Sequence, residues 1–206
     1  LVLTGEPKVA YTTKEIDANT WPDFERLFEK NNGVQGGCWC MYYQRPRPLR
    51  TKMSRTERAK MNRKDKRELA QERRSHGIIV YKRGTPVGWC QYGSREELPR
   101  IDAGRNYRKV EPLSPEKKLW RITCFFVDKD HRGQGIAKTA LRAALESIEK
   151  QGGGIVEAYP VVSKKILAES QWIWFGTRGM FQRERFKPVA RLGASYLLMR
   201  RTLSPS

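Results

Sequence analysis

The stretch from Val127 to Ala137 has the clearest chemical capability in the sequence, because it carries Gly133 and Gly135 close together. Glycine has no Cβ atom, so it lets an anion approach the backbone N–H groups closely. Arg132 and Lys138 stand on either side of the two glycines and add full positive charge. This pattern predicts a turn that binds a phosphate or pyrophosphate through the backbone.

The elements on either side would position this turn. Residues 120–127 are apolar on both alternating faces from Ile122 onward, which is typical of a central strand in a covered sheet. Residues 135–150 predict an amphipathic helix. Its apolar stripe consists of Ile136, Ala140, Leu141, Ala144, Leu145 and Ile148. A helix that starts in the turn would direct its free N–H groups and its positive dipole end toward the anion.

Other phosphate-binding turns fit this sequence poorly. A Rossmann turn needs a third glycine three residues after the second, and Lys138 stands at that position. A Walker P-loop would end in Gly-Lys-Ser or Gly-Lys-Thr, which is also missing. Taken alone, two glycines after a strand also fit a tight turn that binds no ligand.

The run from Arg132 to Ala137 resembles the Arg/Gln-x-x-Gly-x-Gly/Ala signature of the GNAT superfamily of N-acetyltransferases. The resemblance extends along the chain. Cys124–Val127 is similar to the family's fourth strand, Glu157–Pro160 to its fifth, and Gly176–Phe186 to its closing helix. Order and spacing match over about residues 78–201, and residues 9–32 fit the start of the family's fold.

The resemblance implies an α/β fold: one GNAT-like domain over residues 1–206, with a mixed central sheet flanked by helices and a splayed pair of parallel strands. Residues 47–76 would be a basic helical insertion within it. The implied activity is that of an acyltransferase, which moves an acetyl group from acetyl-CoA to an amine by direct attack in a ternary complex. The amine must be neutral to attack, and backbone donors must hold the developing oxyanion.

The same resemblance assigns the residues that bind acetyl-CoA. The backbone of Phe125, Phe126 and Val127 would hold the pantetheine arm and polarise the thioester carbonyl. The pyrophosphate would be bound by Arg132, Gly133, Gln134, Gly135, Ile136, Ala137 and Lys138. The splay between the two parallel strands would admit the cofactor arm.

The proton-transfer residues are less clear, since many family members carry a catalytic Tyr where this sequence has Phe181. Tyr159 and Glu157, on the predicted fifth strand, are the candidates for acid and base. Their other interpretation is aromatic packing for Tyr159 and strand pairing for Glu157. Cys40, Tyr42 and Tyr43 are expected to line the substrate-binding side for the acceptor.

The remaining elements follow from local patterns. Strands are expected near residues 9–13 and 38–43, and a helix between them would bury an apolar stripe. That stripe is Trp21, Phe24, Leu27 and Phe28. Ser54 and Glu57 form a capping-box pattern for a charged helix to about Arg74, ended by Gly77. Strands are expected at 78–81, 87–92, 155–159, 187–191 and 195–201, and a short helix at 176–185.

The net charge of +19 suggests an anionic ligand or partner. From Arg45 to Arg74 there are 13 Lys or Arg and four acidic residues. Three interpretations stay open: a solvated helix, a cover that attracts an anionic acceptor or the cofactor, and a nucleic-acid or ribosome contact, which is not favoured. A nucleic-acid-binding module and a non-catalytic CoA sensor are therefore the alternative functions. The acceptor could be a small amine, an amino acid, a drug or a protein terminus.

Cysteine usage and hydropathy set the expected compartment. Cys38, Cys40, Cys90 and Cys124 lie in apolar stretches, which predicts reduced, buried thiols, and their spacing predicts no metal site. No apolar run reaches the roughly 20 residues that span a bilayer, and no secretory signal is visible. We expect a cytoplasmic protein, monomer or homodimer, without a membrane partner.

Overall fold

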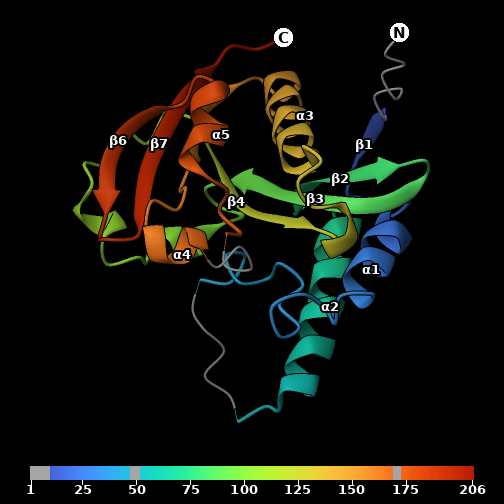
Figure 1. The fold of residues 1–206 in the computed structure, drawn as a ribbon. Helices are drawn as coiled ribbons and strands as arrows, with labels where there is room; N and C mark the ends of the chain where they lie inside the picture. The colour runs from blue at the N-terminus through green and yellow to red at the C-terminus, as the bar shows by residue number, and fades with distance from the viewer. Residues whose placement is uncertain (1–9, 47–51, 169–172) are drawn as a thin grey trace, which may run out of the picture.

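The structure is a computed structural model that describes residues 10–46, 52–168 and 173–206. Its centre is a seven-stranded sheet in the order β1-β2-β3-β4-β5-β7-β6 (Figure 1). The pair β4–β5 is parallel and the other neighbouring pairs are antiparallel. The strands are β1 Tyr11–Glu15, β2 His76–Lys82, β3 Thr85–Ser94, β4 Leu119–Val127, β5 Gly154–Ala158, β6 Lys187–Leu192 and β7 Tyr196–Leu203. The predicted mixed α/β fold with a parallel pair is confirmed.

Helices cover both faces of the sheet. Helices α3 and α5 lie on one face, and α1 and α2 lie on the other (Figure 1). Their bounds are α1 Trp21–Glu29, α2 Arg55–Gln71, α3 Ile136–Lys150, α4 Lys164–Ala168 and α5 Arg178–Arg183. None of the described helices is long and apolar enough to cross a membrane.

Helix α3 packs through the stripe that its sequence predicts. All six apolar residues of that stripe are buried, and they contact side chains of β2, β3 and β4 in one continuous core. At 20–33 cal/mol for each Å² of apolar surface, such burial contributes about 1.5–3 kcal/mol for each large side chain. The packing therefore fixes where α3 begins, one residue after Gly135.

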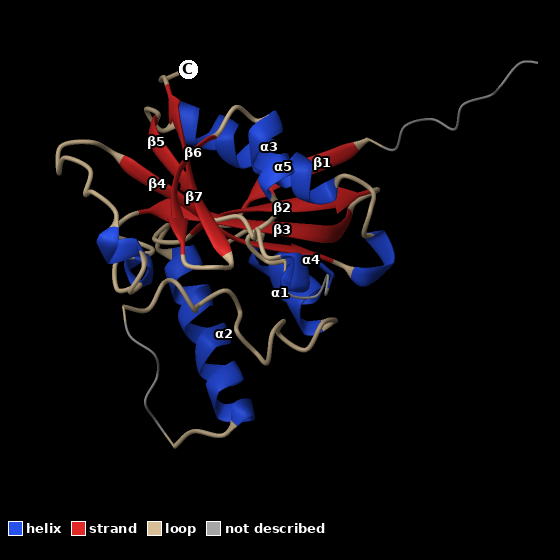
Figure 2. Ribbon diagram, turned by 60° about the vertical axis from the view of Figure 1, so that its left-hand side comes forward, coloured by secondary structure: helices blue, strands red, loops and turns tan. Residues whose placement is uncertain are grey.

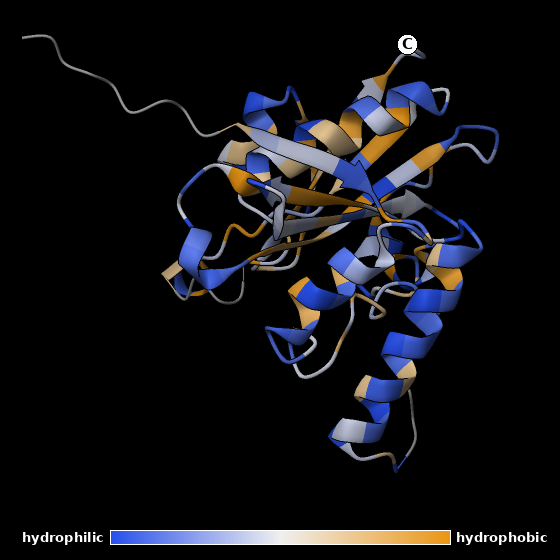
Figure 3. Ribbon diagram, turned by 90° about the vertical axis from the view of Figure 1, so that its right-hand side faces the viewer, coloured by the Kyte–Doolittle hydropathy of each residue, from blue (hydrophilic) through white to orange (hydrophobic). Residues whose placement is uncertain are grey.

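The opposite face holds α1 and the inner end of α2. The predicted stripe of α1 is buried against Trp39 and Trp89. Helix α2 begins with the predicted capping box, in which Ser54 and Glu57 bond each other's backbone N–H groups. The N-terminal end of α2 projects away from the sheet, and most of the helix is hydrophilic (Figures 2 and 3). Residues 47–51 of the predicted basic insertion lie outside the described residues.

Strands β4 and β5 separate as they run toward the site. They pair over Leu119–Ile122 and Ile155–Ala158, whereas β4 stays paired with β3 as far as Val127. The half of β4 beyond Ile122 therefore has one backbone edge that β5 does not cover. Part of this edge faces residues 173–176, since the Phe125 N–H donates to the Trp174 carbonyl over 2.6 Å.

Two local predictions were wrong, and one short helix was missed. Residues 38–43 form turns rather than a strand, and Trp39 and Cys40 have φ of 48° and 50°. The run is apolar because it packs against α1 and β3. The sequence pattern alone cannot distinguish a buried turn of this kind from a buried strand. Gly77 lies inside β2 instead of ending a helix, and a Cβ there would collide with the Trp89 ring. Helix α4 was not predicted.

Candidate active site

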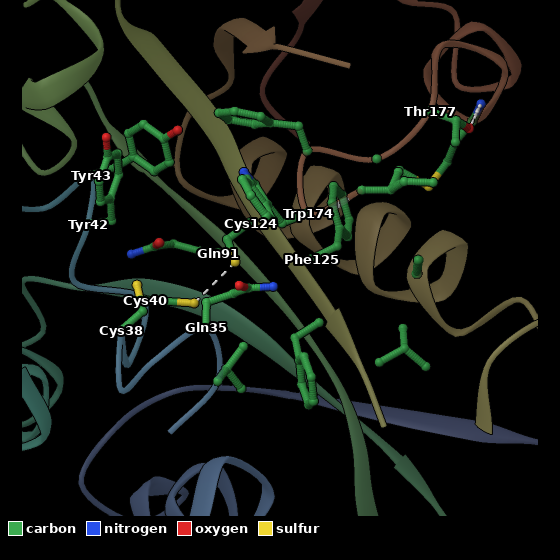
Figure 4. A pocket seen from close by; sticks show the side chains of 18 of the residues that line it. Gln35, Cys38, Cys40, Tyr42, Tyr43, Gln91, Cys124, Phe125, Trp174 and Thr177 are labelled. Carbon is green, nitrogen blue, oxygen red and sulfur yellow. Dashed lines mark hydrogen bonds between the residues drawn. The ribbon is translucent and has the colours of Figure 1, made fainter. Parts of the chain in front are cut away.

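A cavity of about 920 Å³ opens where β4 and β5 separate (Figure 4). One wall is the end of β4, from Cys124 to Val127. The opposite walls are the turns between Asn31 and Tyr43, and residues 173–177 with Met180. Arg132 and Ala137 line the end that meets the glycine-rich turn, so the cavity is continuous with the predicted phosphate site.

The glycine-rich turn has the geometry of an anion cradle. Gly133 and Gly135 have φ of 76° and 82°, and a Cβ at either position would meet no atom within 4 Å. Gly135 is the N-cap of α3, where no side chain caps the helix. The first N–H groups of α3 therefore have no capping side chain, and the space beside both glycines is open, which suits a pyrophosphate.

The side chains of the turn are divided between the ligand side and the core. Arg132 and Lys138 are exposed, whereas the side chain of Ile136 is buried and only its backbone can serve a ligand. The Gln134 side chain accepts a hydrogen bond from Lys82 Nζ at 2.9 Å, which fixes the turn against β2. The residues present thus fit a CoA pyrophosphate, with Gln134 contributing its backbone.

Asp128 anchors the start of the turn. Its carboxylate pairs with Lys30 Nζ of the segment after α1 at 2.8 Å and accepts from the Asp130 N–H. Burial acts to raise its pKa, but the hydrogen bonds from Lys30 and Asp130 outweigh that effect and lower the pKa to about 2. The turn is therefore held in place by an ionised carboxylate.

The three predicted acceptor-side residues line the same cavity. Cys40 is buried, Tyr43 is half-buried and Tyr42 is exposed at the mouth, with the Arg100 guanidinium 3.6 Å from the centre of its ring. Burial raises the pKa of Tyr43 well above its usual range, so its phenol stays protonated. Figure 4 shows Tyr42 and Tyr43 on the opposite side of the cavity from Thr177.

Glu157 and Tyr159 are placed differently from expectation. Neither lines the cavity, and both are at most 2% exposed. The Glu157 carboxylate accepts from the hydroxyls of Tyr107 and Tyr159 at 2.7 and 2.8 Å and pairs with Arg200. Both carboxylate oxygens of Glu157 therefore already accept hydrogen bonds within this buried network. The geometry argues against proton transfer by either residue in the conformation described and gives both a structural role.

Phe181 leaves no phenol in the closing helix α5. Its side chain is fully buried and packs edge-on against Phe125 and Phe186, with ring centroids 6.1 and 5.2 Å away. The ring supports the side of β4 that faces α3. Phe181 therefore supports Phe125, which lines the cavity, without lining the cavity itself. Its ring has no group that could protonate a leaving thiolate.

Sequence reasoning missed several residues of the site. Gln91 of β3, Gln35 and residues 173–177 line the cavity, and Lys66 lies buried behind it. The capping box places Lys66 within a helix, but the surrounding residues are so strongly charged that no apolar pattern marks it as buried. Residues 173–177 could have been suspected from the aromatic run Trp172–Phe175.

The chain belongs to the GNAT family of acetyltransferases, because the model of the acetyltransferase (GNAT) family matches residues 38–164. No curated protein is significantly similar to this chain.

Solved structures with the same fold are distant in sequence. A protein described as an acetyltransferase from Acinetobacter baylyi is 12% identical, with 97% of each chain covered and a TM-score of 0.53. A ribosomal L7/L12 alpha-N-protein acetyltransferase in complex with coenzyme A is 14% identical, with 97% of this chain and 98% of that one covered and a TM-score of 0.53. A protein assigned to the GNAT family from Desulfovibrio desulfuricans is 13% identical over 94% of this chain and 99% of that one, with a TM-score of 0.52. These likenesses support the fold.

Proposed function

We propose that this protein is an N-acetyltransferase that transfers the acetyl group of acetyl-CoA directly to an amine held in the same cavity. The observation that carries the proposal is the continuity between the uncapped N-terminus of α3 and the cavity along β4. The pyrophosphate would lie on the N–H groups from Gly133 to Lys138. The pantetheine arm would follow Val127, Phe126 and Phe125 toward the acceptor side.

The backbone can polarise the thioester. A thioester carbonyl that reaches the Phe125 N–H would gain a donor at the atom where negative charge develops in the transition state, as in other oxyanion sites. Removing one such donor from an enzyme typically costs about 100–1,000-fold in kcat. The acceptor would approach from the side of Cys40, Tyr42 and Tyr43, so both substrates can be bound at once.

The wall of the cavity favours a particular kind of acceptor. Among the described residues that line it, none is Asp or Glu, and Arg132 is the lining cation. A polycationic acceptor would find no counter-charge there, and burying unpaired charge is costly. We therefore favour an amine attached to an apolar or aromatic body. Protein termini and small amines both meet this description.

Binding and turnover test the proposal separately. We expect acetyl-CoA to raise the melting temperature more than ATP does, since ATP lacks the pantetheine arm that β4 would hold. Release of free thiol from acetyl-CoA with a panel of aromatic and aliphatic amines should then follow. Binding without turnover on the whole panel would favour the CoA-sensor alternative, and no stabilisation by acetyl-CoA or CoA would refute the proposal.

A pair of glycine variants makes the binding test specific. Gly135 and Gly84, in the β2–β3 turn, have φ of 82° and 78°, and a Cβ added at either position would meet no atom within 4 Å. Replacing either with Leu should cost a similar backbone strain, about 1–2 kcal/mol. Gly135→Leu alone should abolish acetyl-CoA binding, because its side chain would fill the cradle. Equal affinities of the two variants would contradict the assignment of the cradle.

A further inference from the structure

Two cysteines from distant parts of the chain meet in the wall of the cavity. Cys40 lies in the turns after α1 and Cys124 lies on β4, and their Sγ atoms share a hydrogen bond of 3.2 Å (Figure 4). Both residues line the cavity. A disulfide needs a separation of about 2.05 Å, so the two sulfurs lie roughly 1 Å from bonding distance.

The surroundings of Cys40 stabilise a thiolate. Trp89 Nε1 of β3 donates a hydrogen bond to Cys40 Sγ at 3.2 Å. Lys66 of α2 lies behind the pair, fully buried, with its ammonium 5.3 Å from the centre of the Trp89 ring. Trp89 of β3 thus donates to this sulfur, and Lys66 of α2 places a cation against the same indole.

Lys66 lacks a carboxylate partner among the described residues. Its Nζ donates to the neutral oxygens of Gln44 and Ser75, both at 2.7 Å. Burial lowers its pKa to about 8, so the side chain is still mainly charged at pH 7. A buried cation is costly without an anion nearby. The sulfur of Cys40 can supply that anion.

The other thiols near this site differ from Cys40. Burial raises the pKa of Cys38 to about 11 and also raises the pKa of Cys90. The hydrogen bond with Cys40, together with burial, raises the pKa of Cys124. Burial also acts to raise the pKa of Cys40, yet the bond with Cys124 and the charge of Lys66 leave it below its usual value. Cys90 does not line the cavity. Cys40 is thus the thiol that combines access with thiolate character.

We propose that Cys40 and Cys124 form an oxidation site that takes a small hydroperoxide from the cavity and closes to a disulfide. The Cys40 thiolate attacks the outer peroxide oxygen, an S–O bond forms, the O–O bond breaks, and the alkoxide or hydroxide leaves and is protonated. The Cys124 thiol then loses its proton as its sulfur attacks the Cys40 sulfenic acid. The hydroxide that leaves takes up this proton as water. The two thiols are oxidised by two electrons, and the hydroperoxide is reduced.

The disulfide would tie the acceptor-side turn to β4. The turn that carries Cys40 also carries Tyr42 and Tyr43, whereas the cradle at Gly135 lies at the other end of the cavity. The site rests on the sulfur geometry and does not depend on the proposed acetyl transfer. If that transfer occurs, the disulfide would act on the acceptor side and leave the pyrophosphate site unchanged.

Hydrogen peroxide followed by alkylation and peptide mapping tests this inference. We expect one disulfide, Cys40–Cys124, with Cys38 and Cys90 still alkylated as free thiols and with full reversal by dithiothreitol. In Cys124→Ser, Cys40 should instead accumulate as a sulfenic acid that dimedone traps. Cys90→Ser is the matched control and should oxidise like the unaltered protein. A first disulfide that includes Cys38, or oxidation of Cys90 before Cys40, would overturn the inference.

The role of Lys66 has its own test. Lys66→Met should slow the oxidation of Cys40 several-fold, because less thiolate is present. This buried substitution can unfold the protein, so circular dichroism must accompany it. The unaltered protein gives an independent answer: with limiting iodoacetamide at pH 7, Cys40 should be alkylated before Cys38. The reverse order would refute the thiolate assignment.

Discussion

The backbone N–H of Phe125 on β4 donates to the carbonyl of Trp174 over 2.6 Å, across the gap between β4 and β5. This N–H is the donor that we assign to the thioester carbonyl. The two acceptors compete for one hydrogen atom, so we expect acetyl-CoA to displace the Trp174 carbonyl. The indole of Trp174, which lines the cavity, should move with it.

Tryptophan fluorescence measures this displacement. Acetyl-CoA should change the emission of the unaltered protein, and Trp174→Phe should lose most of that change while it keeps the carbonyl and still binds acetyl-CoA. Trp120→Phe, which alters a buried indole outside the cavity, serves as the control. An undiminished signal in Trp174→Phe would show that the segment stays in place.

The network around Glu157 predicts losses of stability rather than of chemistry. Glu157→Gln removes the buried carboxylate that pairs with Arg200, whereas the fully buried Arg121 keeps its salt bridge to Asp102. Breaking the buried pair with Arg200 should cost about 3–5 kcal/mol. Tyr159→Phe removes one hydrogen bond to a charged group and should cost about 1.5–3 kcal/mol. Urea denaturation measures both effects, and kcat of folded Tyr159→Phe should stay within a few-fold. A fall in kcat of about 100-fold or more with unchanged stability would restore the proton-transfer role.

Asp128 predicts how the protein responds to acid. Its pKa is lowered to about 2 in the folded state, whereas an unfolded Asp titrates near 4. A lowered pKa stabilises the fold at pH values above about 4, and this contribution is lost as the pH falls from about 4 toward 2. The urea midpoint should therefore drop more steeply over that range in the unaltered protein than in Asp128→Asn. Parallel pH profiles would contradict this account of Asp128.

The exposed face of α2 predicts affinity for polyanions without a role in cofactor binding. Replacing four of its exposed cations with Gln should lower the salt at which the protein leaves heparin, yet leave acetyl-CoA affinity within about twofold, because none of them lines the cavity. These residues are Arg58, Lys60, Lys64 and Arg67. A control with the same loss of charge elsewhere replaces Arg105, Lys109, Lys117 and Lys187. Equal elution of the two variants would show that only net charge matters, and a specific loss of acetyl-CoA binding would assign α2 to the cofactor.

The sequence predicts those parts of the fold in which local pattern and tertiary role agree. The stripe of α3, the capping box at Ser54 and the apolar strand β4 are of this kind, and each is confirmed. The turn between β4 and α3 was also predictable, because Gly133 and Gly135 adopt a backbone conformation that other residues rarely take. That this turn binds a pyrophosphate stays a prediction.

The acceptor side was harder to predict because long-range packing decides its shape. Residues 38–43 are apolar enough for a strand, yet they turn sharply between α1 and α2. The burial of Lys66 depends on contacts with Gln44 and Ser75, which lie 22 and 9 residues away. The position of Glu157 on its strand is compatible with a side chain that points into the cleft. Its carboxylate is instead enclosed by Arg121 and Arg200, which lie on other strands. Such partners cannot be read from spacing along one chain.

Strand β6 forms one outer border of the sheet and pairs within it with β7 alone. Pro188 removes a backbone donor from this border, Lys187 and Arg191 add exposed charge, and the register shifts between Pro188 and Ala190. Each of these features discourages a second chain from adding a strand. These features disfavour pairing of this edge with a strand of another molecule, and they act also at salt concentrations that screen the repulsion between highly basic molecules.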